Sequence, residues 1–216
     1  MKINTENIQI LKSDLTDELL NYYSSCDLIA IDCEMMGLNP HRDRLCLLQI
    51  GDEKEIITLV QFLNLELSLK NNNIAINLKK LFENEKVRKI FHFARTDVAF
   101  LYHWLNIDIK NVFCTKTASK LVRTFTDKHS LKDMIKELLN RDIDKNSQLT
   151  DWGAPELTKD QIKYAANDVL YLISSYKKLI ELLKRENRLS IAEEACRFLP
   201  TLAKLDLLGY EDFFAH

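Results

Sequence analysis

The chain has 216 residues, of which 46% are hydrophobic and 29% are charged, and its formal net charge is −2. This length and composition are typical of one globular domain with a sizeable core, so we expect a single domain over residues 1–216. The charge excludes a strongly basic coat for long nucleic acids, which would depend on many Lys and Arg contacts to phosphates. A short nucleic acid substrate remains compatible with it.

Localisation is indicated by apolar runs and cysteines. No stretch approaches the roughly 18 apolar residues of a membrane-spanning helix, and the amino terminus lacks the apolar run of a signal peptide. The five cysteines are an odd number without CxxC spacing, which argues against a disulfide framework and a zinc site. We therefore expect a cytoplasmic protein that contacts no membrane.

The first half of the chain is predicted to contain most of the strands. Residues 13–24 favour a short helix, and LIAIDCE at 28–34 favours a strand with alternating faces. Two more strands follow at 44–51 and 55–60, and the residues between them predict a hairpin. Further elements alternate along the chain, namely a helix at 74–85, a strand at 88–93, a helix at 97–104 and a strand at 112–114.

The second half is predicted to be mainly helical. Helices are expected at 115–123 and 130–139, and the turn-rich segment 140–157 is expected to be a loop. Thr158 and Gln161 form a capping-box pattern before one long helix, whose apolar residues recur at helical spacing as far as Leu183. A last helix is predicted near 188–198. Strands first and helices later are typical of an α/β domain with a mixed sheet.

Four acidic residues and a tyrosine lie in or beside apolar stretches, where an unpaired carboxylate is costly. Asp32 and Glu34 are two apart on a predicted strand and project from one face, and Tyr164 and Asp168 are four apart on a predicted helix. Asp97 begins another predicted helix. Each has an ordinary structural alternative, such as surface display or interaction with a helix dipole. Their combination favours one shared site.

Carboxylates that meet at one point repel each other, and divalent cations relieve that repulsion. Hard oxygen ligands select Mg²⁺ or Mn²⁺ over zinc. Two such ions, roughly 3.5–4 Å apart, can stabilise the attacking and leaving oxygens of a phosphoryl displacement. Tyr164 is a poor base because the ordinary pKa of tyrosine is about 10, so we expect it to hold the attacking water. The pattern predicts a two-metal phosphodiesterase.

The motifs DxE, HxxxxD (His92 to Asp97) and YxxxD occur in this order. They resemble the DEDD superfamily of 3′→5′ exonucleases, in the tyrosine-bearing (DEDDy) branch that includes ribonuclease D, over about residues 28–176. The resemblance implies a ribonuclease H-like (DnaQ-like) α/β fold with a mixed five-stranded sheet flanked by helices. It also implies that the four acids bind metals, that Tyr164 positions water, and that nucleoside 5′-monophosphates are released.

The segment DCEMMGL is also similar to oligoribonucleases of the histidine-bearing branch, but Lys163 stands where that branch has histidine. Leu38 matches the leucine that wedges between the bases of a dinucleotide there, and Met35 and Gly37 belong to the same segment. This resemblance implies that all three bind substrate, and ordinary turn packing is the alternative for Leu38.

Other residues are candidates for substrate contacts. His92 resembles the residue that holds the terminal nucleotide in the family, and a structural strand-end histidine is the alternative; Phe93 replaces an asparagine common there. Trp152 is expected either to line the pocket or to anchor its loop. Gln148 and Lys145 are candidates for contacts to phosphate.

HSLKDMIKELL, the Asp151–Trp152 pair and the ending from about 198 to 216 resemble short stand-alone bacterial enzymes called nanoRNase C. Those enzymes cleave very short RNA, particularly dinucleotides, and assemble into rings of eight. The resemblance implies a short RNA substrate, with DNA left open, and a homo-oligomer, an octameric ring. The apolar tail is expected either to contact a neighbouring subunit or to fold back on its own core.

Two other functions compete with this one. The first is an exonuclease that trims longer RNA or DNA, and the second is a catalytically silent nucleic-acid-binding module.

Overall fold

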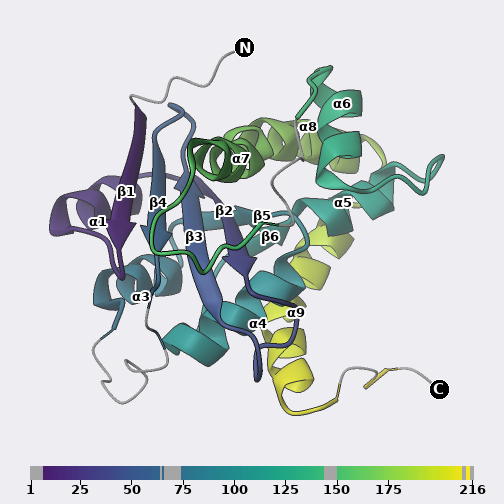
Figure 1. Cartoon of the computed structure of the whole chain (residues 1–216). Helices are drawn as coiled ribbons and strands as arrows, with labels where there is room; N and C mark the ends of the chain where they lie inside the picture. Colours follow the sequence, from purple (N-terminus) through teal and green to yellow (C-terminus); the bar gives the residue numbers. More distant parts are fainter. Residues whose placement is uncertain (1–6, 64, 66–73, 144–149, 211–212, 215–216) are drawn as a thin grey trace.

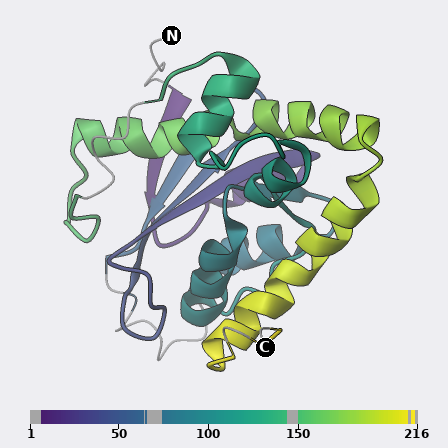
Figure 2. The ribbon, with the colours of Figure 1, turned by 90° about the vertical axis from the view of Figure 1, so that its right-hand side faces the viewer.

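The computed structural model describes residues 7–63, 65, 74–143, 150–210 and 213–214. Within these residues a central sheet lies between two layers of helices (Figures 1 and 2). The sheet has the strand order β1-β4-β3-β2-β5-β6. Its strands are β1 (Ile8–Lys12), β2 (Leu28–Met35), β3 (Leu45–Gly51), β4 (Ile57–Gln61), β5 (Arg88–Phe91) and β6 (Val112–Cys114).

The sheet is mixed, as predicted. Strands β2, β3 and β4 pair antiparallel, whereas β1 with β4, β2 with β5, and β5 with β6 pair in parallel. The predicted hairpin between β3 and β4 is confirmed, and Oδ1 of Asp52 accepts hydrogen bonds from the amides of Lys54 and Ile56 at 2.9 and 2.8 Å. The prediction of five strands was wrong, because β1 adds a sixth. This edge strand is largely exposed on both sides, so it lacks the alternation that reveals a half-buried strand.

One face of the sheet is covered by α7 (Lys159–Leu170) and α8 (Leu172–Arg185). Helix α7 packs over β2, β3 and β4, and α8 packs over β2 and β5. Figure 2 shows both helices on the same side of the sheet. The predicted capping box at the start of α7 is present, since the Thr158 hydroxyl accepts from the amide of Gln161 and the Gln161 side chain accepts from the amide of Thr158.

The prediction of one continuous helix through residue 183 was wrong, because the helix breaks at Tyr171. Tyr171 has φ −103° and ψ −1° and separates α7 from α8. Both helices turn their apolar sides toward the same sheet. The helical spacing of apolar residues therefore continues across the break and does not reveal it.

The opposite face is covered by α4 (Ala94–Leu105), with α9 (Leu189–Leu207) packed against α4 and β6. Nε of Arg95 donates a hydrogen bond of 2.6 Å to Asp206, which ties the two helices together. Helix α9 extends well beyond the predicted end at 198 and passes through Pro200. Proline lacks an amide donor and usually ends a helix, but here α9 continues past it to Leu207.

The remaining helices lie close to their predicted positions, and they are α1 (Asp17–Ser24), α3 (Ile76–Glu83), α5 (Thr115–Val122) and α6 (Leu131–Leu139). None of the helices in the described part of the chain combines the length and the apolar character needed to cross a membrane.

Candidate active site

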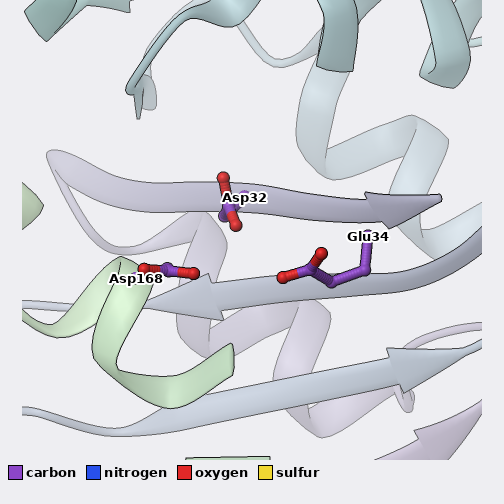
Figure 3. A group of neighbouring side chains, drawn as sticks. All are labelled: Asp32, Glu34 and Asp168. Carbon is purple, nitrogen blue, oxygen red and sulfur yellow. The ribbon is translucent and has the colours of Figure 1, made fainter. Parts of the chain in front are cut away.

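Three of the predicted acids meet between β2 and α7. Asp32, Glu34 and Asp168 each offer a carboxylate oxygen, and these oxygens lie within 4.8 Å of one another. Figure 3 shows the carboxylates of Glu34 and Asp168 pointing toward each other, with Asp32 beside them. We call these three residues the acidic cluster. Residues 134 positions apart in sequence are thus brought together by the packing of α7 on the sheet.

Local geometry explains why these side chains converge. Asp32 and Glu34 are two residues apart on β2, so both project from the face that α7 covers. Tyr164 and Asp168 are four residues apart on α7, and both are buried. Each predicted pair of residues therefore shares one face of its element, and these faces of β2 and α7 pack against each other.

Asp97 lies beside the acidic cluster but is not a member of it in this structure. It occupies the first turn of α4 and is buried. Its carboxylate accepts hydrogen bonds from the amide and thiol of Cys33, which lies between the two acids of β2. Asp97 is thus held next to β2 by the residue that separates Asp32 from Glu34.

Burial is the largest cause of the raised pKa values at this site. Burial, followed by repulsion from Asp168 and Asp97, raises the pKa of both Asp32 and Glu34 well above the ordinary values. Burial also raises the pKa of Asp97, although the hydrogen bonds from Cys33 oppose this effect. Burial and the neighbouring Asp168 raise the pKa of Tyr164 far above the ordinary tyrosine value. The Tyr164 hydroxyl therefore keeps its proton near neutral pH.

A pocket of about 740 Å³ opens onto these residues. All five predicted catalytic residues line it. The predicted substrate-binding residues that also line it are Met35, Gly37, Leu38, His92 and Trp152. Gln148 and Lys145 lie outside the described residues.

The loop that carries Trp152 is anchored by hydrogen bonds on both sides of this residue. Arg44 donates to the main-chain oxygen of Gly153 at 3.1 Å, and Gln161 donates to that of Asp151 at 2.9 Å. The Trp152 ring packs against Tyr164 with centroids 5.9 Å apart, and its buried indole nitrogen has no hydrogen-bond partner within the described chain. Both alternatives for Trp152 therefore apply, because it is anchored in the loop and also lines the pocket.

The segment after Glu34 forms one rim of the pocket. Leu38 is 81% exposed although it is apolar, and Met35 is half-buried. A side chain at Gly37 would clash with Asp43, because a Cβ atom there would lie 2.2 Å from Oδ2 of Asp43. The Asp43 carboxylate in turn accepts a hydrogen bond from the amide of Asn39 at 2.9 Å, which closes the turn.

Lys116 and Phe93 are among the pocket residues that were not predicted as substrate contacts. The ammonium group of Lys116 lies 4.0 Å from the ring centroid of Phe93, and both residues line the pocket. Phe93 adopts a left-handed backbone conformation (φ 68°), which is uncommon for an aromatic residue. The sequence signal for Phe93 was its position beside His92, where the family more often has asparagine.

The donor set suits a hard divalent cation. The acidic cluster offers only carboxylate oxygens, and such ligands favour Mg²⁺ or Mn²⁺ over zinc. Asp32, Glu34 and Asp168 are the residues that would hold such an ion, with Asp97 adjacent.

Comparisons with known proteins show which family the chain resembles. The family described as "3'-5' exonuclease" matches residues 7–184. Ribonuclease D of Gluconacetobacter diazotrophicus is 32% identical over 162 residues, which make up 74% of this chain and 39% of that protein. This chain thus spans well under half of the length of that relative.

Solved structures match over nearly the whole chain. Brucella melitensis NrnC bound to pGG is 43% identical with a TM-score of 0.88, and the match covers 97% of this chain and 98% of that one. The same protein with bound Mg²⁺ is 42% identical with a TM-score of 0.87, at the same coverage. The expected ribonuclease H-like fold and the resemblance to ribonuclease D and nanoRNase C are confirmed.

Proposed function

This chain belongs to the family of 3′-5′ exonucleases, and on that premise we propose that it is a metal-dependent 3′→5′ exoribonuclease. Its proposed substrates are short RNA oligonucleotides, dinucleotides in particular, and its products are nucleoside 5′-monophosphates. The observation that carries the proposal is the acidic cluster, whose carboxylate oxygens lie within 4.8 Å of one another in a pocket of about 740 Å³.

We assign the acids to two divalent cations, Mg²⁺ or Mn²⁺. Asp32, Glu34 and Asp168 would hold them, and Asp97 would join from α4. When bound, the cations would supply positive charge for the attacking water and the leaving 3′ oxygen. A similar protein, NrnC, has been solved with Mg²⁺, which supports this choice.

Tyr164 acts in this proposal as a hydrogen-bond donor and not as a base. Its pKa is raised by burial and by Asp168, so its hydroxyl stays protonated near neutral pH. Such a hydroxyl can orient the attacking water between α7 and β2. Trp152 packs against the Tyr164 ring and restricts its movement.

The pocket dimensions favour a short substrate. A volume of about 740 Å³ lies within the ordinary range of roughly 300–1,000 Å³ for small-molecule sites. In this proposal Leu38 wedges between two bases, His92 and Trp152 contact the terminal nucleotide, and Met35 and Gly37 complete the rim; all five residues line the pocket. The complex of NrnC with pGG supports a short RNA substrate.

We also propose that the protein is a homo-oligomer, with an octameric ring as the expected form. Exposed large apolar side chains occur from the middle of α9 onward, namely Phe198, Leu208, Tyr210, Phe213 and Phe214. Such a group is favourable where a neighbouring subunit covers it. Sedimentation velocity measures the subunit number, and a monomer at micromolar concentration would contradict this part of the proposal.

The function is tested by turnover of a 5′-phosphorylated dinucleotide with Mg²⁺ or Mn²⁺. We expect monophosphates as products, no turnover in EDTA, and a specificity constant for the dinucleotide well above that for a labelled 20-mer.

Asp97→Asn keeps the side-chain shape and should lower turnover by about a thousandfold, because several kcal/mol of charge stabilisation is at stake. Full turnover by this variant would refute the metal assignment. Equal specificity constants would favour a trimming role.

A further inference from the structure

Gln49 is a buried amide without a protein partner. Its side chain on β3 is fully buried, and neither its Nε2 nor its Oε1 has a hydrogen-bond partner within the described chain. An unpaired buried polar group costs about 1–3 kcal/mol. An apolar side chain of the same length would avoid that cost, so the amide calls for a partner that forms in another state of the site.

The register of the sheet places Gln49 next to the acidic cluster. Gln49 is directly opposite Asp32 in the antiparallel pairing of β3 with β2. Opposed residues share a face of the sheet, with Cβ atoms about 4.5–5.5 Å apart. The next pair on this face is Ala30 with Gly51. A Cβ atom on Gly51 would lie 3.1 Å from Val169 of α7, so this face of the sheet is the one that α7 covers.

Gln49 therefore lies in the layer between the sheet and α7. It is absent from the lining of the pocket that contains the acidic cluster. It lies opposite Asp32 on the same face of the sheet but away from the pocket, so it meets no substrate. A neutral amide suits this position, because it can donate hydrogen bonds to carboxylates without competing with a cation for them, as a Lys or Arg would.

We propose that Gln49 is a positioning residue for the acidic cluster, whose amide hydrogen-bonds a carboxylate of Asp32 or Asp168 when these residues bind divalent cations. The inference depends on the proposed function, because it assigns the cluster to cations. Carboxylates that bind metals are themselves commonly held by hydrogen bonds, and loss of such a partner typically weakens metal binding by about 10–100-fold.

The test measures Mn²⁺ binding by isothermal titration calorimetry to metal-free protein, with Gln49→Met as the main variant. Methionine has nearly the same length and flexibility but no N–H donor. We expect Mn²⁺ affinity to fall by about tenfold or more, and the melting temperature of the metal-free protein to stay the same or rise. The kinetic defect should shrink as Mg²⁺ concentration is raised.

Ser175→Ala is the matched control. Ser175 on α8 also has a buried hydroxyl without a partner in the described chain, but it does not line the pocket. Its variant should bind Mn²⁺ like the wild type. Gln49→Leu is measured in parallel, because it also removes the amide but replaces it with a side chain of different shape.

The outcomes separate the two proposals. Wild-type Mn²⁺ affinity in folded Gln49→Met or Gln49→Leu refutes the role of Gln49 and leaves the proposed function intact. An equal loss of affinity in Ser175→Ala also refutes it, because the effect would then not be specific to the cluster. Absence of Mn²⁺ binding by the wild-type protein would contradict the proposed function itself.

Discussion

The Nδ1 atom of His92 lies 3.0 Å from Oγ1 of Thr115, and Thr115 donates its hydroxyl proton to the main-chain oxygen of Phe91 at 2.9 Å. Because a threonine hydroxyl has only one proton, His92 must be the donor to Thr115 through Nδ1. In the neutral ring, Nε2 then carries the lone pair and acts as an acceptor. His92 lines the pocket, so this pair fixes the orientation and the tautomer that the histidine would present to the proposed substrate.

Thr115→Val should therefore weaken substrate binding. The variant keeps the side-chain shape but removes the acceptor that fixes the ring of His92. We expect KM for the dinucleotide to rise by about tenfold, with a smaller change in kcat, since one hydrogen bond is worth about 1 kcal/mol or somewhat more. Steady-state kinetics measures both constants. Thr117→Val on the same helix is the control, and an equal rise in its KM would contradict the interpretation.

Leu38→Ala should separate substrate binding from stability. Leu38 is 81% exposed at the pocket, so its truncation should change the free energy of unfolding by less than about 0.5 kcal/mol. If it wedges between two bases, KM for the dinucleotide should rise by about tenfold, because base stacking is worth about 1–3 kcal/mol. Urea unfolding and kinetics measure the two effects. Phe125→Ala, which is 75% exposed outside the pocket, should change neither.

Gly51→Ala should displace α7 from the sheet. The new Cβ atom would lie 3.1 and 3.3 Å from two side-chain atoms of Val169, next to Asp168. We expect a loss of about 1–3 kcal/mol in the free energy of unfolding from overpacking. Turnover should fall by about tenfold, because small misplacements of a site are costly. The double variant Gly51→Ala/Val169→Ala removes the closer of these two atoms, Cγ2 of Val169, and should recover part of the lost turnover. A double variant no more active than Gly51→Ala would contradict this explanation.

The stability of the metal-free protein should fall as pH rises from 5 to 7. Asp32 and Glu34 have a raised pKa in the folded state, so the unfolded chain releases these protons first. Their contribution is complete below the ordinary carboxyl pKa of about 4 and is lost as pH rises through the raised values. The pH range of this prediction ends at 7 because burial lowers the pKa of Lys89 to about 7. Above that pH the folded protein loses the Lys89 proton before the unfolded chain does, so this group makes stability rise with pH.

Melting temperatures in EDTA across that pH range test this expectation. Saturating Mg²⁺ should flatten the slope, because a bound cation stabilises the ionised carboxylates. Glu34→Gln removes one titrating group without changing its shape and should also show a flatter slope. Equal slopes for this variant and the wild type would show that the cluster does not cause the pH dependence.

Much of the site was predictable from local spacing. Asp32 and Glu34 are two apart on a strand, and Tyr164 and Asp168 are four apart on a helix, so each pair had to share a face whatever the rest of the fold. The capping box at Thr158 likewise predicted where α7 begins. These features depend only on backbone period and on hydrogen bonds between residues a few positions apart.

Other features escaped sequence reasoning because they depend on distant contacts. The edge strand β1 lacks alternation because both of its faces are largely exposed, and the break at Tyr171 is hidden because α7 and α8 turn their apolar sides toward one sheet. Gln49 looked like one polar residue in an apolar strand. Only the pairing of β3 with β2 places it opposite Asp32.

The sequence by itself thus determined which carboxylates share a face, because side-chain direction follows from backbone period over a few residues. Only the tertiary structure decided that the faces of β2 and α7 meet, that Asp97 is held by Cys33, and that an unpaired amide adjoins the cluster. The physical reason is that strand register and helix docking are set by packing between residues far apart in the chain, which no local pattern encodes.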